Sequence, residues 1–387
     1  MSVEPRSAAS RRSLPALAYV VNALNPGGTE KLVVQMSLAF AAEFRVYVFC
    51  LDEPGLWAGE LREQGIPVIC LWRQPGLDLR IPFRLAHELR TCNAEIIHAH
   101  QCTAWFYSAL SRLSYSKPRL VLEEHGRFFP EVDSLTRRMV GRLVLRRLTH
   151  HFVAVSEDVK ARLQRYEGLE ASHIEVIHNG VLAEPPLPDA ERVAIRRELG
   201  FAPDDFVVGT VGRFDPIKNL PMLVRSLAQS AARNARIRGL LIGDGEQLAP
   251  VRALIDSLGV GDRVRVTGFR NDARRLVQCM DLFVLASLSE GTSIALLEAV
   301  AAGVPVAVTA VGGNPEIVVA GQTGWVIPSG AVEALSAAIL EAAGDSQLRN
   351  RLSTAGRQRF AERFGFGNMI SSYRQLYRSL VVADGTK

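Results

Sequence analysis

The sequence predicts an α/β protein built from two doubly wound, Rossmann-like parallel-sheet domains that face a central cleft. Short apolar runs alternate with longer helical patterns along the whole chain. The runs are continuous rather than alternately polar and apolar, which is typical of strands covered by helices on both faces. A proline-rich break separates two stretches of similar length, and repeated strand–helix–strand units indicate a doubly wound fold in each.

The predicted strands come in two groups, one on each side of that break. In the first half they span 17–23, 45–51, 67–72, 95–99, 119–123, 152–155 and 174–177. In the second half they span 206–211, 239–242, 263–267, 281–286, 305–309 and 325–327. The clearest predicted helices span 29–42, 80–90, 220–232, 332–343 and about 368–381.

The proline-rich break sets the expected domain boundaries. Residues 183–189 read AEPPLPD, and closely spaced prolines favour a stiff, extended linker. We expect a disordered tail over 1–14, a first domain over 15–183, a linker over 184–190 and a second domain over 191–365. The segment 366–387 should form a last helix that crosses back to the first domain.

Composition excludes several classes of protein. The chain has 387 residues, is 48% hydrophobic, and carries 45 basic against 40 acidic residues, so nucleic-acid binding has little electrostatic support. Its five cysteines form no CxxC pair, which fits a reducing compartment. No apolar run approaches the ~18–20 residues that span a bilayer. Three arginines before residues 14–21 resemble a signal peptide, but a tail followed by a first strand fits better.

Two cations follow the predicted strand 206–211. Arg213 stands at the strand end, and Lys218 comes five residues later, before the next helix. Ligands of open parallel sheets bind beyond the carboxyl ends of strands, and two fixed cations there can neutralise a diphosphate. Solvated surface charges are the alternative reading.

The segment 289–299 carries the strongest chemical signal. Gly291, Thr292 and Ser293 precede a helix and can offer backbone N–H groups to an anion. Glu290 and Glu298 flank them, and carboxylates accept hydrogen bonds from paired sugar hydroxyls. Such a pair indicates a ligand with both phosphate and sugar, although a capping carboxylate and a helix-surface glutamate are the alternative.

A glycine turn follows the first predicted strand. Gly27 and Gly28 lead into a helix and allow a ligand to approach the backbone, although a plain tight turn explains them equally well. The turn lacks the GxGxxG fingerprint, so an NAD site of the Rossmann type is not supported.

These motifs together resemble those of retaining GT-B glycosyltransferases of family 4, also described as glycosyl transferases group 1. The matching pieces are Glu290-x7-Glu298, Gly212-Arg213-x4-Lys218-Asn219, Leu241-Ile242-Gly243-Asp244-Gly245, Asn179-Gly180-Val181, Gly303-Val304-Pro305-Val306 and Gly312-Gly313-Asn314-Pro315-Glu316. They cover nearly the whole chain in order. His178 departs from the family pattern, which usually has proline before Asn-Gly-Val, and no aspartate follows Val181.

The resemblance implies a role for each matching residue. The implied donor-binding set is Gly28, Arg213, Lys218, Arg270, Glu290, Gly291, Thr292, Ser293, Ile294 and Glu298, and the implied catalytic set is His125, Glu290, Arg213 and Lys218. Within these sets, the cations bind the donor diphosphate, Glu290 contacts the transferred sugar and Glu298 binds the ribose. His125, in Glu124-His125-Gly126, matches the family's active-site histidine, whereas its alternative is an ordinary strand-end residue.

The implied activity is transfer of a sugar from a nucleotide-diphosphate sugar, by default UDP-linked, to a glycan or lipid-linked acceptor. The family retains anomeric configuration and serves polysaccharide or cell-envelope glycan biosynthesis. The chain has no DxD motif or dense carboxylate site, so we expect no essential metal and no cofactor. An epimerase or hydrolase of the same fold is the alternative enzyme, because fold alone does not fix chemistry. A non-enzymatic nucleotide-sugar-binding subunit is the other rival, although all four charged residues of the motif are present.

An arginine-rich segment leaves membrane contact open. Residues 134–149 carry Arg137, Arg138, Arg142, Arg146 and Arg147 among apolar residues. At 100° per residue these arginines spread around the helical wheel, which favours a solvated surface over a lipid-binding face. We therefore expect a cytoplasmic protein, with peripheral contact at the inner face of the membrane as the open alternative.

Overall fold

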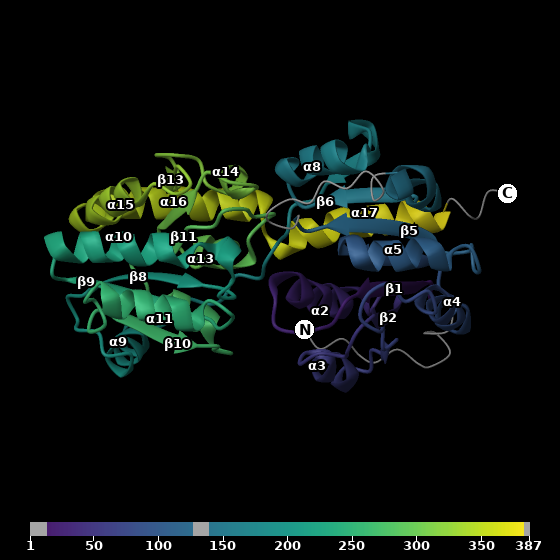
Figure 1. Cartoon of the computed structure of the whole chain (residues 1–387), viewed down its shortest axis with the longest axis horizontal. Helices are drawn as coiled ribbons and strands as arrows, with labels where there is room; N and C mark the ends of the chain where they lie inside the picture. The colour runs from purple at the N-terminus through teal and green to yellow at the C-terminus, as the bar shows by residue number, and fades with distance from the viewer. Residues whose placement is uncertain (1–13, 127–138, 383–387) are drawn as a thin grey trace. The chain divides into compact units, whose positions relative to one another are not determined.

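The computed structural model describes residues 14–126 and 139–382 of the chain. The contacts within it divide the chain into two compact units (Figure 1). Unit 1 consists of Met1–Ile177 with Met369–Lys387, and unit 2 consists of His178–Asn368.

Unit 1 is built on a parallel sheet whose strand order, over the described residues, is β3-β2-β1-β4-β5-β6-β7. The strands are β1 (Ala16–Val21), β2 (Arg45–Cys50), β3 (Val68–Cys70), β4 (Ile96–His100), β5 (Arg119–Glu124), β6 (His151–Ala154) and β7 (Ile174–Val176). The helical segments are α2 (Gly28–Phe40), α3 (Ala58–Glu63), α4 (Ile81–Thr91), α5 (Gln101–Ser111), η1 (Gly141–Leu145), α7 (Arg146–Leu148), α8 (Glu157–Glu167), η2 (Ala171–His173) and α17 (Phe366–Val382).

Unit 2 repeats this plan with a parallel sheet of order β10-β9-β8-β11-β12-β13. Its strands are β8 (Phe206–Val211), β9 (Ile237–Ile242), β10 (Val264–Gly268), β11 (Leu282–Leu285), β12 (Val306–Thr309) and β13 (Trp325–Ile327). Its helical segments are α9 (Asp189–Glu198), η3 (Pro216–Lys218), α10 (Leu220–Arg233), α11 (Leu248–Ser257), α12 (Ala273–Val277), α13 (Ile294–Ala301), α14 (Asn314–Ile317), α15 (Val332–Gly344) and α16 (Ser346–Arg363). The predicted fold class is confirmed, and every predicted strand is present within a few residues of its expected bounds.

Apolar side chains cover both faces of the unit 2 sheet, as the continuous strand runs predicted. Val207, Phe283 and Leu285 point to one face and pack with residues of α13 and α16. Val208 and Val284, which alternate with them, point to the other face and pack with α10, α11 and α15. Because successive strand residues face opposite sides, an apolar residue at every position is what burial on both faces requires.

The boundary between the units falls at Ile177, six residues before the end of the expected first domain. Val181 pairs with the end of α16: its N–H donates to the carbonyl of Phe364 at 3.2 Å, and its own carbonyl accepts from the N–H of Phe366 at 3.1 Å. These backbone bonds tie residues after β7 to unit 2. The predicted linker, 184–190, overlaps the start of α9, because that helix already begins at Asp189.

Helix α17 contributes most of its length to unit 1. Its Tyr377 is buried and lies edge-on to Phe40 of α2, with ring centroids 5.0 Å apart. The hydroxyl of Tyr377 also lies 2.6 Å from Nδ1 of His98 on β4. The last helix thus completes the covering of one face of the unit 1 sheet. Among the described residues, no helix combines the length and apolarity that crossing a membrane requires.

Candidate functional site

The strand order of unit 2 reverses between β8 and β11. Strands β9 and β10 lie on one side of β8, whereas β12 and β13 lie beyond β11. Loops leave the carboxyl ends of two adjacent strands in opposite directions at such a point, which opens a ligand-binding crevice. The residues after β8 and those after β11 are the two motifs that the sequence singled out.

The loop after β8 holds its two cations through Asp215. One carboxylate oxygen of Asp215 accepts from the Ile217 N–H at 3.1 Å and caps the short helix η3. The other oxygen accepts from the Arg213 guanidinium at 3.1 Å, and 71% of the Arg213 side chain is exposed. Arg213 is therefore oriented by a neighbour yet still open to a ligand.

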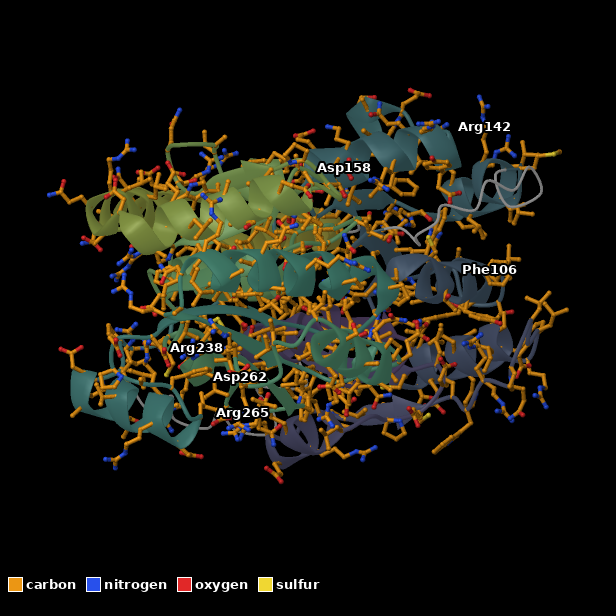
Figure 2. The ribbon with its side chains drawn as sticks, turned by 60° about the vertical axis from the view of Figure 1, so that its left-hand side comes forward. Phe106, Arg142, Asp158, Arg238, Asp262 and Arg265 are labelled. Atoms are coloured by element: carbon orange, nitrogen blue, oxygen red, sulfur yellow. The ribbon has the colours of Figure 1, made fainter. Side chains whose placement is uncertain are left out.

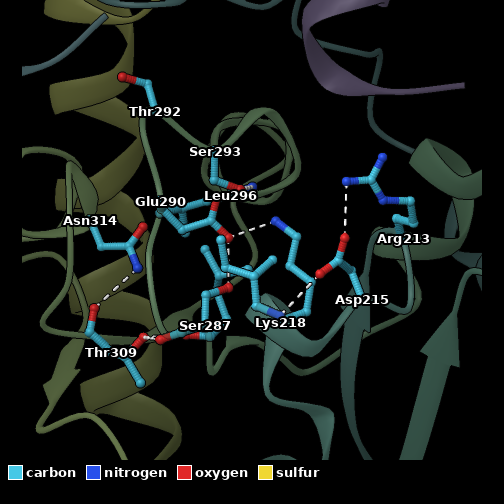
Figure 3. A network of polar contacts seen from close by, with 12 residues as sticks. Arg213, Asp215, Lys218, Ser287, Glu290, Thr292, Ser293, Leu296, Thr309 and Asn314 are labelled. Carbon is cyan, nitrogen blue, oxygen red and sulfur yellow. Dashed lines mark hydrogen bonds and ion pairs between the residues drawn. The ribbon is translucent and has the colours of Figure 1, made fainter. Parts of the chain in front are cut away.

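Lys218 lies at the end of η3 and contacts the loop after β11 (Figure 3). Its ammonium lies 2.6 Å from a carboxylate oxygen of Glu290, and the same oxygen accepts from the Ser287 hydroxyl at 2.6 Å. Only 9% of the Glu290 side chain is exposed. A cation that follows β8 and an anion that follows the adjacent strand β11 thus form one network. The sequence analysis did not identify its third member, Ser287.

Helix α13 begins directly after this network. The Ser293 hydroxyl accepts from the Leu296 N–H at 3.4 Å and caps the helix. The backbone at Gly312 passes so close that a Cβ atom there would lie 1.8 Å from the carbonyl oxygen of Glu290. Gly312 also has a φ of +53°, in the left-handed region that glycine tolerates best. Glycine at 312 therefore lets the 311–314 turn support the 290–293 segment.

Glu298 sits within α13 and has a different partner. A carboxylate oxygen of Glu298 accepts from the Arg274 guanidinium at 2.6 Å, and Arg274 also contacts Glu184 at 3.0 Å. Burial acts to lower the pKa of Arg274, but Glu298 and Glu184 together raise it above its usual value. The sequence analysis missed Arg274 because nothing in the sequence distinguishes it from the adjacent Arg275 on the same short helix, α12 (Ala273–Val277).

Arg270 lies just after β10 and makes a forked pair with Asp272. Its Nε and a terminal guanidinium nitrogen each lie 2.7 Å from a different carboxylate oxygen. The neighbouring Gly268 ends β10 with a φ of +74°. Phe269, which lies between Gly268 and Arg270, is exposed.

The two remaining candidates lie in unit 1, where the strand order reverses between β1 and β4. Gly28 is the first residue of α2, and the loop that contains it leaves β1. His125 follows β5, and its Nε2 lies 2.9 Å from Nδ1 of His100 at the end of β4. The next residue, Gln101, has a φ of +72°, a strained value for a residue other than glycine.

His100 and His125 belong to a buried cluster that the sequence reasoning did not find. His98, His100 and Glu123 bring ligand-type atoms within 4.8 Å of one another, a distance within which metal ligands can gather. The sequence did contain a sign of this cluster: His98 and His100 lie two residues apart on one predicted strand, so their side chains share a face of the sheet. The expectation of no metal rested on missing carboxylate motifs and did not consider this cluster.

Comparison with known proteins matches each unit to a family model. Residues 26–184 match the model described as Glycosyltransferase Family 4, and residues 191–359 match Glycosyl transferases group 1. A lipopolysaccharide core biosynthesis glycosyltransferase of Rhizobium meliloti, LpsD, is 27% identical over 91% of this chain and 95% of its own. The UDP-Gal:alpha-D-GlcNAc-diphosphoundecaprenol alpha-1,3-galactosyltransferase of Escherichia coli is 24% identical over 82% of this chain and 84% of its own.

Solved structures show the same architecture. Anabaena HepE in complex with UDP-glucose superposes with a TM-score of 0.84 at 23% identity, over 94% of this chain and 99% of that one. The fold, with a parallel-sheet unit on each side of residue 177 and ligand motifs at strand ends, is that of a GT-B glycosyltransferase. The chain belongs to the family 4 glycosyltransferases, whose group 1 model matches its second unit.

Proposed function

We propose that the chain transfers a sugar from a UDP-sugar to a glycan or lipid-linked acceptor, with retention of anomeric configuration and without a metal ion. The contact between Lys218 and Glu290 across the ends of β8 and β11 carries this proposal. It joins a cation suited to a diphosphate with a carboxylate suited to sugar hydroxyls, at the point where the strand order reverses.

The leaving group is the nucleoside diphosphate, which gains negative charge as the anomeric C–O bond breaks. Arg213, Lys218 and the N-terminus of α13 offset that charge. The backbone of Gly291, Thr292, Ser293 and Ile294 holds the donor, and Glu298 binds the ribose. Arg270 is the remaining donor-binding residue of unit 2. In unit 1, Gly28 binds the donor, and His125 orients the acceptor or the transferred sugar.

Retention follows from attack on the face that the leaving group occupied, with the departing phosphate accepting the proton of the acceptor hydroxyl. Two relatives support the choice of donor, because the names of the Escherichia coli enzyme and of the HepE complex include UDP-Gal and UDP-glucose. The diphosphoundecaprenol in the first name and the lipopolysaccharide core in that of LpsD support a lipid-linked or cell-envelope acceptor.

A screen of nucleoside diphosphates and their sugars tests the donor. UDP and one UDP-sugar should raise the melting temperature of the chain most, because a ligand that binds only the native state stabilises it. The chosen UDP-sugar should then be consumed rapidly only when an acceptor is added, and NMR of the product should show the donor's anomeric configuration. Equally fast consumption without acceptor would identify a hydrolase or epimerase instead.

Metal independence gives a second expected result. Transfer should continue at an unchanged rate after dialysis against excess EDTA, because the cations that offset the diphosphate charge are Arg213 and Lys218. The assay is product formation before and after chelation, with and without added Mg²⁺ or Mn²⁺. Loss of activity that either ion restores would contradict the proposal.

The spread of the arginines around the helical wheel favours a solvated surface, but exposed apolar side chains support the alternative, and we also propose on their account that the arginine-rich segment touches anionic lipid. Arg137 and Arg138 lie outside the described residues, but Arg142 is exposed at the edge of its unit (Figure 2). Met139, Val140, Leu143 and Val144 are exposed beside it, and such a mixture of apolar and basic side chains suits a membrane surface. The chain should sediment with anionic vesicles at low salt, and Arg142→Glu with Leu143→Ser should weaken this. Absence of sedimentation would favour the solvated reading.

A further inference from the structure

The motif Asn179-Gly180-Val181 matches the family pattern, yet the proposed donor site leaves it without a role. These residues follow β7 in the chain and lie at the start of unit 2. Asn179 is buried, with 3% of the residue exposed. Its side-chain amide lies 3.1 Å from the backbone carbonyl oxygen of Thr292, in the segment proposed to hold the donor. Because a carbonyl only accepts hydrogen bonds, the amide nitrogen of Asn179 is the group that donates.

The chain on each side of Asn179 is anchored near the end of α16. Before it, the His178 ring lies edge-on to that of Phe364, with ring centroids 5.3 Å apart and planes at 90°. After it, a Cβ atom at Gly180 would lie 2.7 Å from the carbonyl oxygen of Gly365, so glycine allows the two backbones to pass this closely. Asn179 is therefore held in a fixed place, from which its short side chain can orient another segment.

The bond from Asn179 fixes a whole peptide unit of the donor segment. The carbonyl of Thr292 and the N–H of Ser293 belong to one planar peptide unit and point in opposite directions. Ser293 is the N-cap of α13, so its N–H is not used within the helix and can donate to an anion. By holding the carbonyl, Asn179 also holds the Ser293 N–H in one direction, away from itself.

His178, which stands where the family usually has proline, holds the same segment by a second route. Its Nε2 lies 3.0 Å from a carboxylate oxygen of Glu316 on α14. The turn before α14 is bound to the donor segment, because the N–H of Gly313 donates to the carbonyl of Gly291 at 3.0 Å. A proline side chain has no hydrogen-bonding group, so the contact with Glu316 is a property of this chain rather than of the family pattern.

The Asn179 side chain is poorly suited to a role in stability alone. Its Oδ1 atom is buried and has no hydrogen-bond partner among the described residues. A buried acceptor without a partner costs free energy and therefore needs an explanation. An amide whose N–H group must reach one particular carbonyl supplies that explanation.

We propose that His178 and Asn179 are positioning residues that hold the backbone of residues 291–293 in the orientation that binds the donor diphosphate. Neither residue contacts the donor itself. Asn179 acts through the N–H of Ser293, and His178 acts through the turn before α14. This inference rests on the proposed function, in which that backbone holds the donor, and it expects loss of either side chain to weaken diphosphate binding.

The amide of Ser293 reports the positioning directly in the wild-type chain. UDP should shift its ¹H–¹⁵N NMR signal downfield, as a new hydrogen bond to a phosphate oxygen does. If UDP binds and the Ser293 signal does not move, the inference fails while the proposed donor site stands. If neither UDP nor another nucleoside diphosphate binds, the proposed function and the inference fail together. This measurement needs no variant and no acceptor.

Two variants then test the side chains. Asn179→Ala should abolish most of the Ser293 shift and weaken UDP binding by about 10-fold in calorimetry, the equivalent of one hydrogen bond. His178→Ala should weaken UDP binding by a smaller factor, because it acts through the turn. Wild-type UDP affinity in a folded chain that carries both substitutions would overturn the inference.

The chain offers a matched control for each variant. Ser226→Ala removes a buried hydrogen bond to a backbone carbonyl, that of Val332 at 3.0 Å, elsewhere in the same unit. His151→Ala removes a contact between a histidine and a glutamate, Glu175, at 2.8 Å in unit 1. All four variants should melt a few degrees below the wild type, but the two controls should keep its UDP affinity. An equal loss of affinity in the controls would show a general effect of stability and contradict positioning.

Discussion

Replacing Lys218 with alanine is expected to lower kcat for sugar transfer by about 10²–10³-fold, the usual effect of removing one preorganised group that offsets transition-state charge. Lys218 is the cation that reaches the loop after β11, where its ammonium lies 2.6 Å from Glu290. Its loss removes charge at the proposed diphosphate site and leaves the nearly buried Glu290 carboxylate with Ser287 as its remaining side-chain hydrogen-bond donor within the described part of the chain. Steady-state kinetics with saturating donor measures the effect.

A matched control separates this loss from a general effect of charge. Arg233 lies exposed in the last turn of α10, in the same unit, and Arg233→Ala removes one positive charge away from the carboxyl ends of the strands. We expect Arg233→Ala to keep wild-type kinetics, and both variants to melt within a few degrees of the wild type. Full activity of a folded Lys218→Ala protein would remove the basis of the proposed donor site.

Replacing Glu298 with alanine is expected to weaken donor binding more than it slows the chemical step. A carboxylate that accepts from sugar hydroxyls contributes about 1.5–3 kcal/mol per charged hydrogen bond, or about 10–100-fold in the donor KM. If Glu298 holds the ribose, it binds donor and transition state equally, so kcat should change little. Titration calorimetry with UDP alone should show the same loss of affinity.

The partner of Glu298 supplies the control for this experiment. Arg274 contacts both Glu298 and the more exposed Glu184, so Glu298→Ala leaves the partly buried guanidinium paired with Glu184 alone among the carboxylates that the structure describes. Glu184→Gln removes the other partner and leaves the proposed ribose contact in place. We expect wild-type UDP affinity from Glu184→Gln, and an equal loss in the two variants would show that Arg274, rather than Glu298, determines donor binding.

The positions of the strands follow from the sequence because burial on both faces leaves a direct mark on it. Strand β11 is an unbroken apolar run, and β8 and β12 depart from one only at Gly209, Thr210 and Thr309, all of which are buried. The motifs after β8 and β11 could also be assigned to strand ends, since a polar residue at the end of an apolar run marks the carboxyl edge of the sheet. The pattern of apolar and polar residues along the chain does not show which strands are neighbours in the sheet.

Strand adjacency and side-chain pairing arise only in three dimensions. The contact of Lys218 with Glu290 spans 72 positions, and that of Tyr377 with His98 spans 279. The sequence alone placed the cations and the Glu-x7-Glu pair at strand ends, because periodicity and spacing are local properties, and the resemblance of these motifs to family 4 indicated the class of the protein. The tertiary structure decided that Glu123 lies among three imidazoles and that Glu298 pairs with Arg274, because such contacts depend on sheet order and on how distant helices pack.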